Sequence, residues 1–90
     1  MQTISILVKG KVQGVFFRKY TVKAALKFGL SGFVENTQGG DVYIEATGTE
    51  TAIEEMIKWC NSGSPWSKVE EVIVDKLPFR QFEGFDIRYR

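Results

Sequence analysis

The sequence has 90 residues, of which 43% are apolar, and its formal net charge is +1. This length predicts one domain whose core can form without disulfides, and the small net charge gives no electrostatic reason to expect nucleic acid or an anionic membrane as a partner. The chain contains one cysteine, Cys60, and no histidine, which excludes an internal disulfide, a Cys/His zinc site and any catalytic nucleophile that depends on histidine.

The first predicted elements are a strand over Thr3–Lys9 and a helix over residues 17–28. Alternating apolar residues indicate the strand. In the helix, a lysine at every fourth position marks a solvated side, and the opposite side is suited to face a core. The residues of that opposite side are Phe17, Thr21, Ala24, Ala25 and Phe28. Gly29 follows as a left-handed helix cap.

The loop that joins this strand to this helix, residues 10–18, contains two glycines and ends at Arg18. Glycine lets the backbone turn several N–H groups toward one point, and the first N–H groups of a helix have no internal acceptor. Arg18 adds a permanently charged, planar group suited to phosphate oxygens. The loop lacks the Gly-Lys-Ser/Thr ending and the G-x-G-x-x-G spacing of nucleotide-binding loops. Two interpretations remain: a site for a small phosphate or carboxylate, or a tight turn with a surface arginine.

The next segment predicts a hairpin, with strands over Leu30–Asn36 and Asp41–Thr47 and a turn at residues 38–40. Asn36 ends the first of these strands. It can support the turn, as asparagine often does. With one acceptor and two donors, it can instead point into the same site as Arg18 and hold a water molecule for attack on phosphorus. The residue pattern alone leaves both roles open.

A second helix opens within residues 48–51. Thr51 and Glu54 fit a capping box there, and Thr49 is a competing N-cap. The apolar face of this helix has the i, i+3, i+4, i+7 spacing and consists of Ile53, Met56, Ile57 and Cys60. Residues 61–65 end the helix in a loop.

Two further strands are predicted, over Lys68–Leu77 and over Phe82–Tyr89, with Pro78 between them. Trp66, in the preceding loop, is left open between packing over a helix end and exposure to solvent. The complete order is strand, helix, strand, strand, helix, strand and a short terminal strand. This order predicts a ferredoxin-like split βαβ sandwich, an α+β fold of βαββαβ order in which two helices cover one face of a mainly antiparallel sheet.

Two segments of the chain resemble the signatures of the acylphosphatase family. Residues 10–18, Gly-Lys-Val-Gln-Gly-Val-Phe-Phe-Arg, match the pattern G-x-V-Q-G-V-x-F/M-R. The second signature is carried by Gly32, Phe33, Val34, Asn36, Gly40, Val42 and Gly48. Phe33 stands where tryptophan is common and Glu35 where a basic or amide residue is usual, and strand alternation predicts that Glu35 points away from Asn36. The resemblance covers the whole chain, so residues 1–90 are interpreted as a single acylphosphatase-like domain.

The resemblance implies hydrolysis of the carboxyl-phosphate anhydride of small acyl phosphates to carboxylate and phosphate. It implies that Arg18 binds the phosphate and stabilises developing charge, and that Asn36 orients a water molecule whose proton passes to the phosphate. The implied substrate-binding N–H groups belong to Gln13, Gly14, Val15, Phe16, Phe17 and Arg18. No metal, other cofactor or covalent intermediate is implied. Inorganic phosphate or sulfate is expected as a ligand, and the protein is expected to be a monomer.

Two other functions fit the same fold. One is a binding module that senses phosphate or carbamoyl phosphate, or an accessory domain of a larger assembly. The domain occupies the chain from Met1 onward, which favours a free enzyme over this alternative. The other is an RNA-binding domain, which needs aromatic residues on the exposed face of the central strands, where residues 41–47 offer only Tyr43.

The amino terminus has no charged segment followed by a long apolar core, and no apolar run approaches about 20 residues. We therefore expect neither a signal peptide nor a membrane span. A single cysteine at a core position suits a reducing compartment. These features predict a cytoplasmic protein without a membrane partner.

Overall fold

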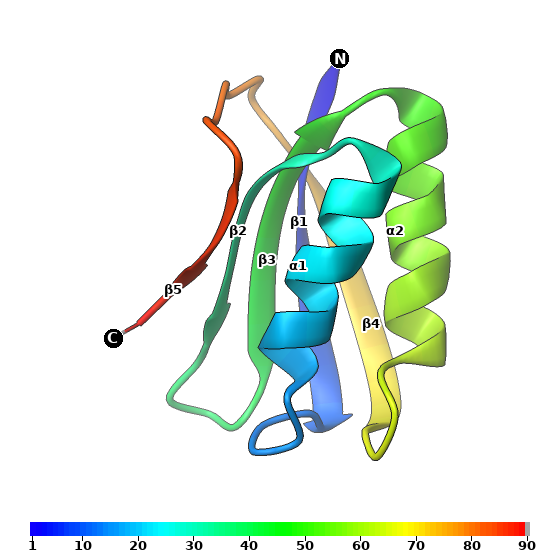
Figure 1. The fold of residues 1–90 in the computed structure, drawn as a ribbon, viewed down its shortest axis with the longest axis vertical. Coiled ribbons are helices and arrows are strands. Elements are labelled where there is room, and N and C mark those ends of the chain that lie inside the picture. The colour runs from blue at the N-terminus through cyan, green and yellow to red at the C-terminus, as the bar shows by residue number, and fades with distance from the viewer. Residues whose placement is uncertain (90) are drawn as a thin grey trace.

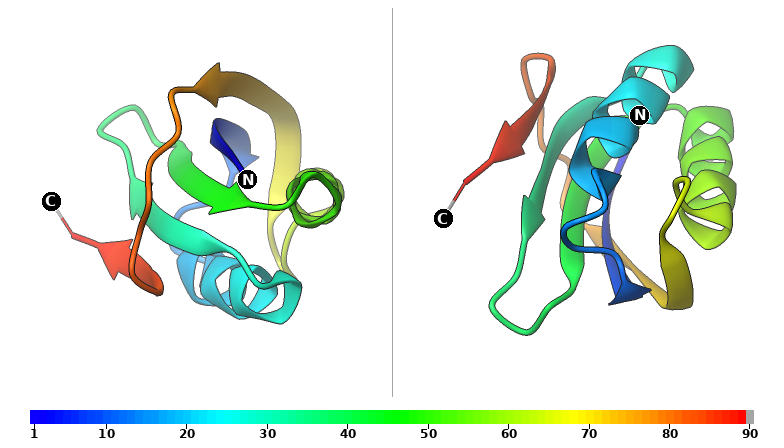
Figure 2. Two further views of the ribbon diagram at one scale, coloured as in Figure 1. Left: turned by 90° about the horizontal axis from the view of Figure 1, so that it is seen from above. Right: turned by 60° about the horizontal axis from the view of Figure 1, so that its bottom comes forward.

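The computed structural model describes residues 1–89 of the chain. Two helices lie side by side across one face of a five-stranded sheet (Figure 1, Figure 2). The elements, in chain order, are β1 (Gln2–Lys11), α1 (Phe17–Phe28), β2 (Ser31–Asn36), β3 (Val42–Gly48), α2 (Glu50–Ser62), β4 (Lys68–Leu77) and β5 (Phe85–Arg88). The predicted ferredoxin-like architecture is confirmed in its element order and in the placement of both helices on one face.

The strands are ordered β4-β1-β3-β2-β5 across the sheet. Neighbouring strands are antiparallel except for β2 and β5, which run parallel. The register of this parallel pair sets Gly32 opposite Phe85 and Glu35 opposite Arg88. Because parallel strands end at the same edge of a sheet, Asn36 at the end of β2 lies level with the residue that follows β5, Tyr89.

The core fills the space between the sheet and the two helices. The side chains of the sheet that are fully buried there include Ile6, Val8, Val34, Val42, Ile44 and Ala46. The predicted core sides of the helices are buried as well, through Phe17, Thr21, Ala24, Ala25, Ile53, Met56 and Cys60. Phe28 and Ile57 pack against this core while partly exposed. Periodicity therefore identified the buried side of each helix.

A β-bulge near the end of β1 redirects the chain toward the start of α1. The register of β1 against β4 shifts between Lys9 and Gly10. Gly10 has a φ of 129°, and a Cβ at this position would collide with the backbone oxygen of Lys68. The position therefore requires glycine. The bulge lets the chain leave the sheet and form the loop that precedes α1.

The segment between β4 and β5 crosses the end of the sheet and is held there by two threonines. The Arg80 N–H donates to Thr3 Oγ1 at 2.9 Å, and Thr47 Oγ1 donates to the Arg80 carbonyl oxygen at 2.6 Å. Figure 1 shows this segment, in orange, passing from β4 to the opposite edge of the sheet. The crossing brings β5 alongside β2. Strand β5 therefore lies at the opposite edge of the sheet from β4, the strand that precedes it in the sequence.

The start of α2 differs from one of the two predicted caps. Thr49 is the N-cap, because its Oγ1 accepts a hydrogen bond from the Ala52 N–H at 3.1 Å. Thr51 lies inside the helix, which begins at Glu50, so the capping box of Thr51 and Glu54 is wrong. No helix within residues 1–89 combines the length and apolar character needed to cross a membrane.

β5 is shorter than the predicted strand over Phe82–Tyr89. Gly84 turns the chain with a φ of 69°, and its carbonyl oxygen accepts a hydrogen bond from the Gly32 N–H at 2.9 Å. Phe82 lies before this turn and packs edge-on against Phe33 at 5.9 Å between ring centroids. The alternating apolar pattern therefore begins at Phe82, before Phe85, where strand pairing begins.

Candidate functional site

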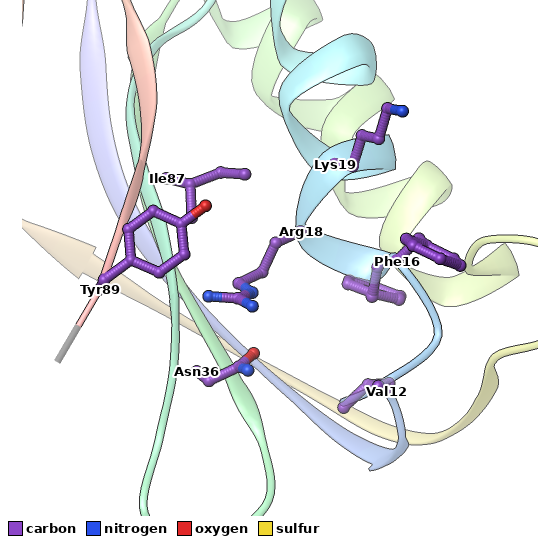
Figure 3. A pocket seen from close by; sticks show the side chains of 9 residues that line it. Val12, Phe16, Arg18, Lys19, Asn36, Ile87 and Tyr89 are labelled. Carbon is purple, nitrogen blue, oxygen red and sulfur yellow. The ribbon is translucent and has the colours of Figure 1, made fainter.

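A pocket of about 380 Å³ lies between the start of α1, the end of β2 and the end of β5 (Figure 3). We call it the Arg18 pocket. Its lining residues are Val12, Gly14, Phe16, Phe17, Arg18, Lys19, Asn36, Ile87 and Tyr89. Arg18 and Asn36, which sequence reasoning placed in one site, thus line one pocket although they belong to different elements.

The start of α1 lines this pocket, and its first backbone N–H groups have no acceptor within the helix. Phe16 is the N-cap residue, in the left-handed conformation with a φ of 61°, and no side chain of residues 1–89 caps the helix. The N–H of Tyr20 donates to the Phe16 carbonyl oxygen at 3.2 Å. The N–H groups of residues 16–19 precede this bond and have no intrahelical acceptor. The first turn carries no acidic residue, so the positive end of the helix dipole is not neutralised there.

Arg18 extends from the first turn of α1 into the pocket. Figure 3 shows its guanidinium between Tyr89 and Asn36. The Arg18 Cζ lies 5.1 Å from the centroid of the Tyr89 ring. This contact holds a flexible side chain over the pocket while leaving its N–H groups free to bind an anion.

Asn36 contributes a buried acceptor with no partner. Its Oδ1 is inaccessible to solvent and accepts no hydrogen bond from any group within residues 1–89. An unsatisfied buried acceptor costs about 1–3 kcal/mol. The neighbouring Glu35 is itself buried and, by strand alternation, points to the other face of the sheet. The Asn36 oxygen is therefore an unsatisfied acceptor at the wall of the pocket, and a donor bound there reaches it once the side chains that cover it move.

The side chain of Gln13 points away from the pocket and binds the β2–β3 turn. Its Nε2 donates to the carbonyl oxygens of Thr37, at 2.9 Å, and Asp41, at 2.7 Å. Within the turn, the Thr37 N–H donates to the Asp41 carbonyl oxygen at 2.9 Å. Asp41 also forms an ion pair with Lys9 at 3.3 Å. The turn that follows Asn36 is thus tied to both β1 and the loop before α1.

The predicted substrate-binding residues divide into two groups. Gly14, Phe16, Phe17 and Arg18 line the pocket. Gln13 and Val15 are not among its lining residues, since Gln13 binds the turn and Val15 packs against the core. The sequence predicts a role for these two residues through their backbone N–H groups, and the structure gives each side chain a separate contact.

Four lining residues were missed by sequence reasoning: Val12, Lys19, Ile87 and Tyr89. The family pattern includes the position of Val12, which was a usable signal. Ile87 and Tyr89 reach the pocket only because β5 pairs with β2. The sequence predicts that Lys19 belongs to the solvated side of α1, and Lys19 is exposed as predicted. It also borders the pocket.

Cationic side chains border the pocket. A neighbouring hollow of about 220 Å³ shares Arg18, Asn36 and Tyr89 and adds Arg88. The ion pairs formed within residues 1–89 involve none of Arg18, Lys19 and Arg88. The same part of the chain offers no cluster of three or more His, Cys, Asp or Glu residues that could hold a metal ion. An anion in the pocket therefore meets the charges of Arg18 and Lys19, which form no ion pair within residues 1–89.

Comparison with known proteins matches this chain to one family. A family model described as Acylphosphatase matches residues 4–87. The curated acylphosphatase of Geobacter sulfurreducens is 41% identical over 85 residues, which are 93% of each chain. That of Aeropyrum pernix is 45% identical over 86 residues, covering 93% of this chain and 85% of the relative. The crystal structure of acylphosphatase from Bacillus subtilis matches with a TM-score of 0.96 and 37% identity, over 99% of this chain and 100% of that one.

Proposed function

This chain belongs to the acylphosphatase family, and from that premise we propose that the Arg18 pocket is its active site. The family assignment makes the protein an enzyme that hydrolyses acyl phosphates. The assignment of chemical roles to single residues rests on the geometry of the pocket. The observation that carries it is the buried, unpartnered Oδ1 of Asn36 in the pocket that also holds Arg18.

The phosphoryl group binds at the start of α1. The N–H groups of residues 16–19 and the helix dipole favour an anion there. The guanidinium of Arg18 donates two parallel hydrogen bonds to phosphate oxygens, and its charge balances the charge that develops on them in the transition state. Gly14, with a φ of 74°, allows the loop to curve around the bound group.

The side chain of Asn36 positions the attacking water. Its Oδ1 accepts a hydrogen bond from the water, whose oxygen forms a bond to phosphorus while the bond from phosphorus to the acyl oxygen breaks. The electron pair of the broken bond leaves with the carboxylate. One proton of the water passes to a phosphate oxygen. A carboxylate is a stable leaving group, so the reaction needs no acid or base from the protein, which has no histidine.

The test compares three variants for hydrolysis of acetyl phosphate. We expect Asn36→Ala to lower kcat by about 10²–10³-fold while the melting temperature and the binding of inorganic phosphate stay close to those of the parent. Arg18→Ala is expected to weaken phosphate binding and to lower kcat together. Asn61→Ala is the matched control, because the Asn61 side chain is exposed and binds only the Ile57 carbonyl oxygen of its own helix. Parent-like turnover by Asn36→Ala would remove the water-positioning role.

The same proposal makes inorganic phosphate and sulfate ligands of the Arg18 pocket. Both anions should inhibit competitively against acetyl phosphate, because they would occupy the site of the phosphoryl group. Purely noncompetitive inhibition would show that the anion binds elsewhere. Hydrolysis should also persist in excess EDTA, since no step is assigned to a metal.

We further propose that the protein is a cytoplasmic monomer. Support for the monomer comes from the edge strand β4, whose exposed residues include Lys68, Glu70, Glu71, Asp75 and Lys76. Charged side chains on an edge strand oppose pairing with a second sheet. Size-exclusion chromatography with light scattering tests the mass, and fractionation of cells tests the location.

A further inference from the structure

A second pocket, of about 250 Å³, adjoins the Arg18 pocket on the side of α1. We call it the Trp66 pocket. Its lining residues are Phe16, Lys19, Tyr20, Lys23 and Trp66. Phe16 and Lys19 line both pockets. The two pockets therefore meet at Phe16 and Lys19.

Two exposed aromatic side chains form the walls of the Trp66 pocket. Phe16 is 68% exposed and Trp66 is 73% exposed. Within residues 1–89 these are also the two non-glycine residues with positive φ, 61° and 66°. Bulky residues rarely adopt this conformation, and it costs about 1–3 kcal/mol at each position. Phe16 and Trp66 thus expose large apolar rings to solvent and also adopt a strained backbone conformation. Both features disfavour the folded state, and exposed apolar surface of this kind is expected where a ligand binds.

The Trp66 pocket also carries positive charge that pairs with no carboxylate of residues 1–89. Lys19 and Lys23 take part in none of the ion pairs formed within residues 1–89. The Nζ of Lys23 lies 5.9 Å from the centroid of the Tyr20 ring, which also lines this pocket. The combination of flat apolar walls with unpaired ammonium groups suits an apolar group that bears an anion.

The direction of the reaction places the leaving group on this side. In an in-line displacement the leaving group lies opposite the attacking water. The water is assigned to Asn36, and Figure 3 shows Phe16 on the side of Arg18 toward the start of α1, away from Asn36. We propose that the Trp66 pocket binds the acyl group of the substrate and favours acyl phosphates with a planar apolar body and a second negative charge. This inference rests on the proposed function of the Arg18 pocket.

Three substrates test the planar apolar body and the second negative charge separately. They are acetyl phosphate, benzoyl phosphate and 4-carboxybenzoyl phosphate. We expect kcat/KM to rise in that order for the parent protein. Trp66→Ala should lower the ratio of kcat/KM for benzoyl phosphate over acetyl phosphate by about 3- to 10-fold, the usual value of one aromatic contact. Lys23→Ala should lower the ratio for 4-carboxybenzoyl over benzoyl phosphate by about 2- to 5-fold at low ionic strength, and less in salt.

Matched controls come from exposed residues outside both pockets. Phe79→Ala removes an aromatic ring that is 62% exposed. Lys27→Ala removes an exposed lysine of α1, the helix that also carries Lys23. Both should keep the parent ratios. If Trp66→Ala and Lys23→Ala also kept the parent kcat/KM ratios while hydrolysing acetyl phosphate normally, the Trp66 pocket would not bind the acyl group. The proposed function of the Arg18 pocket would be unaffected by that result.

A binding measurement on the parent protein provides a second test that does not depend on a variant folding. Phenacylphosphonate has a methylene group in place of the scissile oxygen of benzoyl phosphate and is not hydrolysed at that position. Its binding should change the tryptophan fluorescence, to which the exposed Trp66 and the partly exposed Trp59 both contribute, more than inorganic phosphate does at saturation. Equal spectra with the two ligands would show that the acyl group does not reach Trp66, and would overturn the proposal.

Discussion

The side-chain amide of Gln13 donates a hydrogen bond to the carbonyl oxygen of Thr37 at 2.9 Å, across 24 positions of sequence. Thr37 directly follows Asn36, and Gln13 lies in the loop that leads into the N–H groups of residues 16–19, which are assigned to the phosphate. A second bond from the same amide to Asp41, at 2.7 Å, holds the other end of the turn. One side chain therefore sets the spacing between the group assigned to the water and the groups assigned to the phosphate.

Gln13→Leu should lower kcat for acetyl phosphate by about 10- to 100-fold, because displacements of about 1 Å in a site cost that much. Loss of the two hydrogen bonds should also lower the free energy of unfolding by about 1–3 kcal/mol. Kinetic assays and chemical denaturation measure the two effects separately. Gln38→Leu, at an exposed position of the same turn, is the control. A loss of stability with unchanged kcat and KM would show that Gln13 stabilises the turn but does not position the site.

The contact between Arg18 and Tyr89 leads to a second prediction. Removing the ring in Tyr89→Ala should raise KM for acetyl phosphate by about 2- to 5-fold, because an exposed cation–π contact contributes about 0.5–1 kcal/mol. Tyr89→Phe keeps the ring and should match the parent. If both variants raised KM equally, the phenolic hydroxyl would be the important group and the ring contact with Arg18 would not.

Sequence reasoning identified most of the fold because the relevant signals are local. The bounds of α1 follow from its lysine side, its apolar side and the cap at Gly29, which has a φ of 76°. The alternation in β3 likewise separated Ile44, which is fully buried, from Tyr43, which is partly exposed. The limits of β5 could not be predicted in this way, since Gly84 turns the chain within an alternating pattern.

The candidate site was only partly accessible to the same reasoning. Arg18 and Asn36 each lie in a recognisable segment, so a resemblance could place them together. Tyr89 reaches the pocket through the pairing of β5 with β2, a contact between distant segments that no local pattern encodes. The direction of the Gln13 side chain and the exposure of Trp66 depend on loop conformation, which short sequence patterns determine weakly.

Gly10 and Gly40 provide a comparison of two kinds of glycine. Gly10→Ala should lower the free energy of unfolding by about 2–5 kcal/mol, because the new Cβ meets the backbone of β4 in addition to the strained φ of 129°. Gly40 has a φ of 91° with open space around it, so Gly40→Ala should cost only about 1–2 kcal/mol. Urea denaturation of both variants checks the difference, and equal losses would contradict the backbone collision.

The buried Cys60 leads to a prediction about alkaline pH. The thiol is fully buried, and burial raises its pKa from the ordinary 9.0 to about 12. Since the folded state holds this proton more tightly than the unfolded state, the thiol stabilises the fold fully below about pH 9. That contribution falls as the pH rises toward 12, by about 1.4 kcal/mol per pH unit.

Cys60→Ala isolates this effect, although it also removes packing atoms at a cost that does not depend on pH. Burial and the neighbouring Glu45 raise the pKa of Tyr43 to about 12 as well, but Tyr43 titrates in both proteins and cancels in the comparison. The free energy of unfolding of the parent minus that of Cys60→Ala should be constant near neutral pH and should decrease above about pH 9. In the native state the thiol should react with a disulfide reagent far more slowly than after unfolding. Parallel pH profiles, or a fast native reaction, would show that the thiol ionises as freely as one in solvent.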